Sequence, residues 1–297
     1  VSSAIFIMAG IAAALDSGMN CMSKDQQATL CSTKTKNLSM LAAYCLCATW
    51  AVVFWHHFSD QDFSTVLTMS SITQFLGFVL LALKVRWAKS AAGLSSKTLE
   101  MYFMFFCFRL SSTCFKNGYL PIDRSGDWVY QSGDALSVLV VLHLLYVTHK
   151  TYGTTYQAQH DSLDIFKAII PCAILAFFVK GDLNSSPFFD WVWTTSLLLD
   201  TIAMLPQLWM MTKAGGKVDG MTSHYVVTLS ISRAFAFAFW WHGYTELHIE
   251  GSSFNKAGYT VLLAHLIQMM LCADFLYYYV KGMLAGRGTA VLPNIEV

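Results

Sequence analysis

Long apolar runs separated by short polar segments dominate the pattern along this chain. Seven of these runs follow residue 65, most of them close to the roughly 20 residues that a membrane-spanning helix requires. Backbone polar groups must be paired in hydrocarbon, and continuous rather than alternating apolar runs favour helices over barrel strands. The pattern therefore predicts seven transmembrane helices. They cover Val66–Val85, Leu99–Phe115, Trp128–Val147, Ile165–Val179, Trp191–Met211, Tyr225–Trp241 and Tyr259–Val280.

Two further apolar runs precede these seven. Leu38–Trp55 predicts one extra N-terminal transmembrane helix. Ala4–Leu15 is too short to span a membrane and is expected to be an interfacial or signal-like segment. The chain begins with Val rather than Met, which indicates processing or truncation. We expect three parts: an N-terminal extension over 1–65, a seven-helix domain over 66–285 and a C-terminal tail over 286–297.

The composition supports a membrane protein. Hydrophobic residues make up 55% of the 297 positions and aromatic residues 14%, but only 12% are charged. Because soluble domains carry about 25% charged residues, a disordered chain is excluded and an ordinary cytosolic enzyme is disfavoured. The 19 basic and 18 acidic residues nearly cancel, which leaves no bulk positive field for nucleic acid. We expect an all-α membrane protein that contacts membrane lipid and has no nucleic acid partner.

Lysine and arginine residues are distributed unevenly between the two ends of the predicted helices. One side collects 13 of them and the other collects 4, while Arg109 and Arg233 lie inside helices. Positively charged loops face the cytoplasm, so the richer side and the C-terminus are predicted to be cytoplasmic. The richer side holds Lys24, Lys34, Lys36, Lys84, Arg86, Lys89, Lys97, Lys150, Lys167, Lys213, Lys217, Lys281 and Arg287.

The sequence contains no recognisable catalytic or cofactor-binding motif. It has no zinc-type CxxC pattern, phosphate loop or dinucleotide fingerprint, and no nucleophile–base pair is visible. Six of the eight cysteines lie in apolar runs, where cysteine usually packs as a small hydrophobic residue. We therefore predict a protein that is not an enzyme and that has no cofactor and no metal site.

Two segments suggest an internal repeat. Gly93-Leu94-Ser95-Ser96 precedes the helix that carries Arg109, and Gly220-Met221-Thr222-Ser223 precedes the helix that carries Arg233. Each segment follows a positively charged loop, and the two copies face the same way. Parallel three-helix repeats are a known membrane architecture with a binding site between the repeats. The fold is thus predicted to be a seven-helix bundle of two parallel three-helix repeats plus a linking helix.

A series of short motifs runs through most of the seven helices. In order and spacing they resemble the endoplasmic reticulum (ER) lumen protein-retaining receptors, the KDEL/HDEL receptor family, and they are nearer to its divergent plant-type branch. Pro206-Gln207 also resembles the PQ-loop of the wider transporter superfamily. The motifs are Ala92-Gly93-Leu94-Ser95-Ser96-Lys97, Phe108-Arg109-Leu110, Thr155-Tyr156, His160-Asp161, Pro171, Leu205-Pro206-Gln207-Leu208, Thr222-Ser223-His224-Tyr225, Ser232-Arg233, Cys272-Ala273-Asp274-Phe275 and Tyr278-Tyr279.

The resemblance implies a polar pocket, open to the lumen, that binds a C-terminal tetrapeptide in the acidic Golgi and releases it in the neutral ER. In that family, arginines on several helices bind the carboxylates of the signal, because a guanidinium makes paired hydrogen bonds to a carboxylate. A histidine of the first helix senses pH in the range where imidazole titrates. The ligand-binding residues that carry over are Arg109, Arg233, Trp240, Asp200 and Asp274, with Asp182 matching a lumenal aspartate.

The sequence departs from the family pattern at several of its functional positions. The first-helix arginine falls at Leu67 and the first-helix histidine at Gln74. A second-helix aspartate falls at Ser112, and Ser232 replaces the tyrosine before Arg233. The second sixth-helix arginine falls near Gly243, where His242 is the nearest polar candidate for the ligand site; the tail also lacks the family's clustered lysines.

Ionisable residues inside spans are functional candidates that require partners. Arg109 either binds a ligand carboxylate or forms an ion pair with Asp274 or Asp200. For Arg233 the structural interpretation is favoured, and for Asp134 we expect a water-lined or helix-pairing role. His143 and His265 lie in apolar runs, where a lone histidine is usually hydrogen-bonded between helices.

Three functional hypotheses follow. The first is a retrieval receptor that binds HDEL- or KDEL-type C-terminal peptides. The second is a repurposed, non-catalytic structural subunit of a larger, organellar membrane complex, whose partners are other membrane subunits. The third is a PQ-loop-type transporter of a small solute. By resemblance, the localisation is a multi-pass membrane protein of the ER and Golgi, with another organelle membrane as the alternative.

Overall fold

The computed structural model describes residues 64–116, 127–182, 186–214, 216–247, 254–284 and 291–292. All of them belong to one compact unit, Ser59–Val297. The predicted helix Leu38–Trp55, the short run Ala4–Leu15 and most of the tail lie outside the described residues. The extra N-terminal helix and the three-part division of the chain therefore stay predictions.

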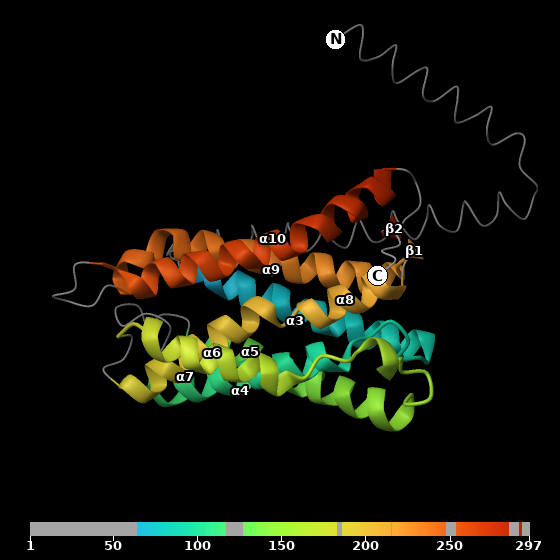
Figure 1. Ribbon diagram of the computed structural model, residues 1–297, viewed down its shortest axis with the longest axis horizontal. Helices are drawn as coiled ribbons and strands as arrows, with labels where there is room; N and C mark the ends of the chain where they lie inside the picture. Colours follow the sequence, from blue (N-terminus) through green and yellow to red (C-terminus); the bar gives the residue numbers. More distant parts are fainter. Residues whose placement is uncertain are drawn as a thin grey trace, which may run out of the picture. The chain divides into compact units, whose positions relative to one another are not determined.

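The described residues are helical apart from loops and one two-residue ladder, which confirms the all-α prediction (Figure 1). In the ladder β1, Gly216–Lys217, pairs antiparallel with β2, Val291–Leu292. Short helical turns occur at η1 (Val147–Thr151), η2 (Ala158–His160) and η3 (Tyr244–Leu247). The long helices are α3 (Ser64–Ala88), α4 (Ser96–Lys116), α5 (Asp127–Tyr146), α6 (Ile165–Val179), α7 (Pro187–Ile202), α8 (Leu205–Ala214), α9 (Gly220–Gly243) and α10 (Lys256–Leu284).

Four segments of the described chain are long and apolar enough to cross a membrane. They are Thr65–Ala88, Tyr130–Thr151, Ala158–Val179 and Lys256–Gly282. The remaining helices, α4, α7 with α8, and α9, are more polar or shorter. Such helices suit the interior of a bundle, where neighbouring helices satisfy their polar side chains.

Helices α7 and α8 occupy the run that the sequence predicts as one helix, Trp191–Met211. The structure divides it at Ala203-Met204, directly before Pro206. Proline lacks a backbone N–H and its ring disfavours helical geometry in the preceding residue, so a helix readily ends there and a new one begins with proline in its first turn. The break allows α8 to follow a separate path from α7.

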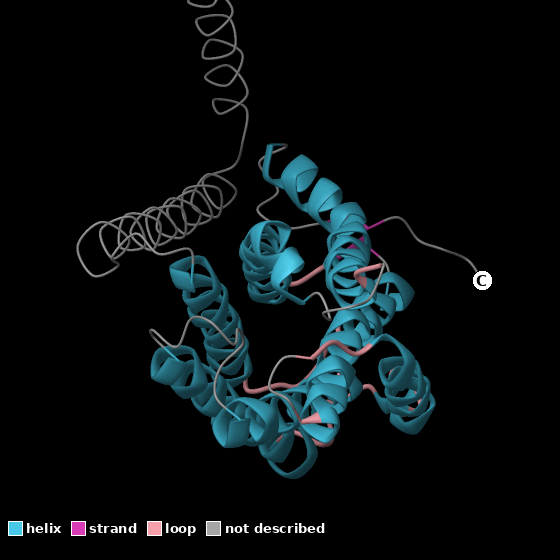
Figure 2. Cartoon of the chain, turned by 90° about the vertical axis from the view of Figure 1, so that its left-hand side faces the viewer, coloured by secondary structure: helices cyan, strands magenta, loops and turns pink. Residues whose placement is uncertain are grey.

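Helix packing follows a regular pattern. Helix α3 packs on α9, and α4 packs on α7; α5 packs on both α3 and α4, and α10 packs on both α9 and α7. Helix α6 packs mainly on α7. Figure 2 shows the bundle in a view turned by 90° from that of Figure 1, with many helices seen close to end-on.

An aromatic cluster fills the core between α3, α4 and α9. The ring centroid of Phe78 lies 5.1 Å from that of Tyr102, 5.8 Å from that of Phe106 and 5.9 Å from that of Tyr225. All four side chains are essentially inaccessible to solvent. Edge-to-face and tilted contacts of this kind add roughly 0.5–1.5 kcal/mol per pair beyond area burial.

The N-terminus of α4 is tied to α8 by one amide side chain. The Oε1 atom of Gln207 accepts a hydrogen bond from the backbone N–H of Ser95 at 2.9 Å, and its Nε2 donates to the carbonyl of Gly93 at 2.9 Å. The backbone N–H of Gln207 donates to Oγ1 of Thr98 at 2.9 Å. Gly93 has a φ of 73°, which glycine adopts without steric cost. Gln207 thus links the beginning of α8 to the beginning of α4.

A carboxylate fixes the segment before α6 to the same end of α4. Asp161 is buried and accepts hydrogen bonds from Oγ of Ser95 at 2.7 Å, from the N–H of Lys97 at 3.1 Å and from the hydroxyl of Tyr156 at 2.6 Å. Burial, together with the hydrogen bond to Asp161, raises the pKa of Tyr156 above its usual value. The phenol stays protonated and serves as a donor.

Candidate functional site

Four of the six predicted ligand residues converge on one buried cavity between α3, α4, α7, α9 and α10. The four are Arg109, Arg233, Asp200 and Trp240. The cavity has a volume of about 30 Å³, which is room for an ordered water rather than a peptide. The other wall residues are Leu67, Ser70, Phe105, Trp193, Ser196, Leu197, Ala236 and His265.

Arg233 on α9 is paired with Asp200 on α7. Its NH2 atom donates to Oδ1 of Asp200 at 2.6 Å, and both side chains are 5% exposed. Nε2 of Gln268 on α10 donates to Oδ2 of Asp200 at 2.9 Å and to its backbone carbonyl at 2.8 Å. Two neighbours thus satisfy this carboxylate, and the pair joins three helices without a net charge.

Arg109 on α4 is paired with Asp134 on α5, in a two-point contact. Its Nε donates to Oδ2 at 2.6 Å and its NH2 donates to Oδ1, which also accepts a hydrogen bond from Oγ of Ser71 at 3.1 Å. The guanidinium lies over the ring of Phe105, 4.6 Å from its centroid, in a cation–π arrangement. Asp134 is 1% exposed. The expected partners Asp274 and Asp200 were wrong, whereas the helix-pairing role expected for Asp134 is confirmed.

The remaining lining is aromatic and weakly polar. The ring centroid of Trp240 lies 5.6 Å from that of Trp193 on α7, in an edge-to-face contact. Nδ1 of His265 lies 2.8 Å from the carbonyl oxygen of Val261. Because a carbonyl oxygen only accepts, Nδ1 carries the proton and Nε2 is left as an acceptor. This bond lies within α10, not between helices as the sequence led us to expect.

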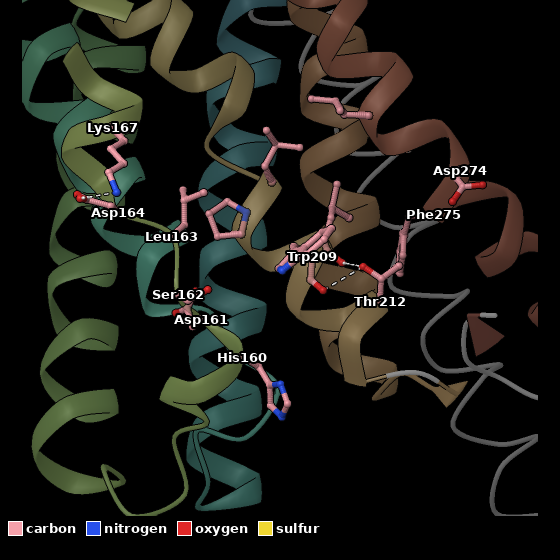
Figure 3. Close-up of a pocket in the computed structure, with 14 residues that line it drawn as sticks. His160, Asp161, Ser162, Leu163, Asp164, Lys167, Trp209, Thr212, Asp274 and Phe275 are labelled. Atoms are coloured by element: carbon pink, nitrogen blue, oxygen red, sulfur yellow. Dashed lines mark hydrogen bonds and ion pairs between the residues drawn. The ribbon is translucent and has the colours of Figure 1, made fainter. Parts of the chain in front are cut away.

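The other two predicted ligand residues lie elsewhere. His242 is exposed near the end of α9 and does not line the cavity. Asp274 is exposed on α10 and lines a different and larger cavity (Figure 3). Sequence reasoning also missed Gln268 and Trp193. A polar amide inside the apolar run of α10 was the available signal for Gln268.

The positions at which the sequence departs from the receptor pattern are buried. Leu67 lines the cavity where the resemblance places an arginine, so an apolar side chain occupies that part of the wall. Gln74, at the position of the pH-sensing histidine, is 1% exposed, and its Nε2 has no hydrogen-bond partner among the described residues. Ser232 and Ser70 exchange hydrogen bonds between Oγ and backbone carbonyl at 2.7 and 2.8 Å, which tie α9 to α3.

Within the described ranges, no group of three or more histidine, cysteine or acidic side chains is placed to hold a metal ion. The cavity itself offers two guanidinium groups for charge-assisted hydrogen bonding, each already paired with a carboxylate, and two indole rings.

Comparison with known proteins identifies the family. The model of the ER lumen protein retaining receptor family matches residues 90–242, which include both arginines, their two aspartates and Trp240. The ER lumen protein-retaining receptor of Dictyostelium discoideum is 31% identical over 224 residues, which cover 74% of this chain and 94% of that relative. The chain belongs to the ER lumen protein-retaining receptor family.

Vertebrate members of the family give the same result. The ER lumen protein-retaining receptor 2 of Gallus gallus is 28% identical and that of Bos taurus 27% identical, each over 218 residues, covering 73% of this chain and 93% of the relative. ER lumen protein-retaining receptors are not enzymes, and this chain is a non-enzymatic, multi-helix membrane protein of that family.

Proposed function

We propose that the chain is a retrieval receptor that binds the C-terminal retention signal of ER-lumen proteins and cycles between Golgi and ER membranes. The observation that carries this proposal is the convergence of Arg109, Arg233 and Trp240 on one cavity. Leu67 and Gln74, which replace two charged or titratable groups of the family, support a place nearer the divergent plant-type branch.

Ligand binding requires the two arginines to change partners. A signal carboxylate replaces Asp134 or Asp200 as the acceptor, so that each guanidinium stays paired and no buried charge is left alone. The bidentate geometry of a guanidinium suits a carboxylate of either source. Pockets for small ligands have volumes of about 300–1,000 Å³, so the cavity of about 30 Å³ has to enlarge by separation of its helices.

The test is direct binding of a labelled peptide to the purified full chain in nanodiscs. A peptide that ends in HDEL is expected to bind in mildly acidic buffer and to dissociate in neutral buffer. The same peptide with a C-terminal amide is the matched control and should bind roughly ten- to hundredfold more weakly, because one charge-assisted hydrogen bond is lost. Equal binding of acid and amide peptides, or no binding at either pH, contradicts the proposal.

The proposed architecture is two parallel three-helix repeats joined by α6, with all seven helical segments crossing the membrane. One triplet is α3, α4 and α5, and the other is α7 (continued by α8), α9 and α10. The packing supports it in two ways. In each triplet the third helix, α5 or α10, packs on the first and the second. The first helix of each triplet packs on the second of the other, α3 on α9 and α7 on α4. A two-fold relation between the triplets accounts for both facts, and in this arrangement the cavity lined by Arg109 and Arg233 lies between the triplets.

A second candidate is a structural subunit of a larger membrane complex. The observation that favours it is the internal neutralisation of both cavity arginines, together with Leu67 in place of an arginine. Such a cavity needs no ligand to be stable. Gentle solubilisation and size analysis of native membranes separate the two: a subunit migrates with its partners at high mass, whereas a retrieval receptor migrates at or near its own mass.

A further inference from the structure

One histidine of the arginine cavity has a ring nitrogen that makes no recorded hydrogen bond. His265 is 3% exposed and belongs to the cavity wall. Its Nδ1 donates to the carbonyl oxygen of Val261 at 2.8 Å, and no hydrogen bond to its Nε2 is recorded among the described residues. Of the described wall residues, it is the one uncharged side chain that can gain a proton between neutral and mildly acidic pH. His265 can therefore become a third cation of the cavity.

His265 lies beside an ion pair of the cavity. Gln268, three residues further along α10, donates to Asp200 at 2.9 Å. Residues three apart lie on one face of a helix and about 4.5 Å apart along its axis. His265 is therefore on the face of α10 that meets the Arg233–Asp200 pair, one turn nearer the start of the helix at Lys256. The charge distribution predicts that this end is lumenal, which is the side from which a signal enters.

The charged groups around His265 come from three other helices. They are Arg109 of α4, Asp200 of α7 and Arg233 of α9, whereas α3 contributes only Leu67 and Ser70 to the described wall. Elements α6, η3 and β2 also pack on α10, but no described residue of these three lines the cavity. Each arginine already has an aspartate partner, so a protonated histidine in the cavity without ligand has no carboxylate of its own.

A ligand carboxylate changes this balance. The two arginines and their two aspartates sum to zero charge, so one entering carboxylate leaves one negative charge in excess. A buried charge without a counter-charge is strongly unfavourable. We propose that His265 takes up a proton from the buffer when the signal binds, and that its Nε2–H then donates to the signal carboxylate that Arg233 binds. This role of His265 rests on the proposed function and names the residue through which pH controls it in this chain.

The same residue supplies a pH dependence that the first helix lacks. The resemblance places the pH-sensing histidine of the family at Gln74, whose amide does not titrate in this range. With protonation at His265, the complex holds one more proton than the separate protein and peptide. Its affinity should therefore fall by up to about tenfold per pH unit as the pH rises.

The experiment measures binding to the full chain in nanodiscs from about pH 5 to about pH 8, where imidazole titrates. The probe is an N-acetylated peptide that ends in KDEL, because its own groups do not change charge over most of this range. Calorimetry in buffers of different ionisation enthalpy gives the proton uptake, which should be about one per peptide for the unmodified chain.

His265→Asn keeps a donor for the Val261 carbonyl but cannot titrate. It should bind roughly ten- to hundredfold more weakly in acidic buffer, because one charge-assisted hydrogen bond is lost, and should take up no proton. His143→Asn is the matched control, since His143 is an exposed histidine of α5 outside the cavity. This variant should keep the affinity and the pH profile of the unmodified chain.

Three results overturn the assignment: binding of the unmodified chain without proton uptake, a His265→Asn variant that keeps the original pH profile, or the same loss in His143→Asn. If His265→Asn does not purify as a folded protein, His265→Gln is the second variant that cannot titrate, and it is judged by the same profile. Absence of all binding by the unmodified chain rejects the proposed function itself. Binding that keeps its pH dependence without His265 rejects only the role of this residue.

Discussion

Each of the two cavity arginines lies against an aspartate of a neighbouring helix. A buried charge without a partner costs several kcal/mol, so each pair stabilises its helix contact chiefly because either member alone would be unpaired. Arg109 and Asp134 are 12% and 1% exposed, and their contact joins α4 to α5. Substitution of these two residues therefore tests whether Arg109 and Asp134 form a buried ion pair.

A double-mutant cycle on Arg109 and Asp134 should give strongly non-additive losses. Arg109→Met and Asp134→Leu should each lower the free energy of unfolding by about 3–5 kcal/mol, because each leaves one buried charge alone. The double variant should lose less than either single one. Unfolding of the purified protein in detergent, followed by circular dichroism, measures this.

The partly exposed pair Lys97–Glu100, with a separation of 3.2 Å and exposures of 32% and 30%, is the control for this cycle. Lys97→Met should cost less than about 1 kcal/mol. Additive losses in the Arg109–Asp134 cycle would mean that the two side chains do not depend on one another.

The sequence identified the charged residues of the site but not their pairing. Arg109, Asp134, Asp200 and Arg233 all attract notice as ionisable groups inside apolar runs. Which carboxylate meets which guanidinium depends on how each helix is rotated about its axis. Near-continuous apolar runs carry little periodic signal for that rotation, so Arg109 was assigned the wrong partners.

At the scale of elements, the attachment of α8 to the beginning of α4 depends on Gln207. Replacing it by leucine removes the partners of the Ser95 N–H, which is buried, and of the Gly93 carbonyl, which is partly buried, both at 2.9 Å. Each unsatisfied backbone group costs about 1–3 kcal/mol, so Gln207→Leu should lower the free energy of unfolding by about 2–6 kcal/mol. Thermal unfolding in detergent measures the loss.

Gln159→Leu is the matched control, since Gln159 is exposed and no side-chain hydrogen bond is recorded for it. It should change the free energy of unfolding by no more than about 0.5 kcal/mol. Equal effects of the two substitutions would show that the amide of Gln207 does not hold α8 to α4.

Element positions were mostly predictable because the apolar runs are long. The run Ile165–Val179 coincides with α6, and the run Leu99–Phe115 lies inside α4. Polar first turns, such as Ser96 in α4 and Gly220 in α9, extend the helices beyond their apolar runs and were missed. The division of α7 from α8 was missed as well, since an apolar run continues through Pro206 and only local backbone geometry ends the helix.

For the whole molecule, burial separates two classes of helix. Helix α9 buries most of its length and carries many polar side chains, whereas α6 exposes large apolar ones such as Phe166, Phe177 and Phe178. This arrangement is the one expected of a bundle with a polar interior and lipid outside. Span counting alone could not assign helices to inside and outside; the motifs that resemble the receptor family indicated the arrangement of the bundle.

The orientation of the bundle in its membrane is the prediction at this scale. The ends of α8 and α10 meet in the β1–β2 ladder, and α4 begins beside Gln207 of α8, so these ends share one face. Among the described residues, that face holds more lysine and arginine residues, including Arg86 of α3, Lys213 of α8 and Lys281 of α10, than the opposite end, where Lys256 begins α10. The positive-inside rule places the richer face in the cytoplasm.

An epitope added after Val297 should therefore be accessible to antibody in cells whose plasma membrane alone has been permeabilised. An epitope inserted at Phe254, before α10, should become accessible only after all membranes are opened. The reverse result would invert the assigned orientation. Accessibility of both epitopes under the first condition would mean that α10 does not cross the membrane, because this helix alone separates the two positions.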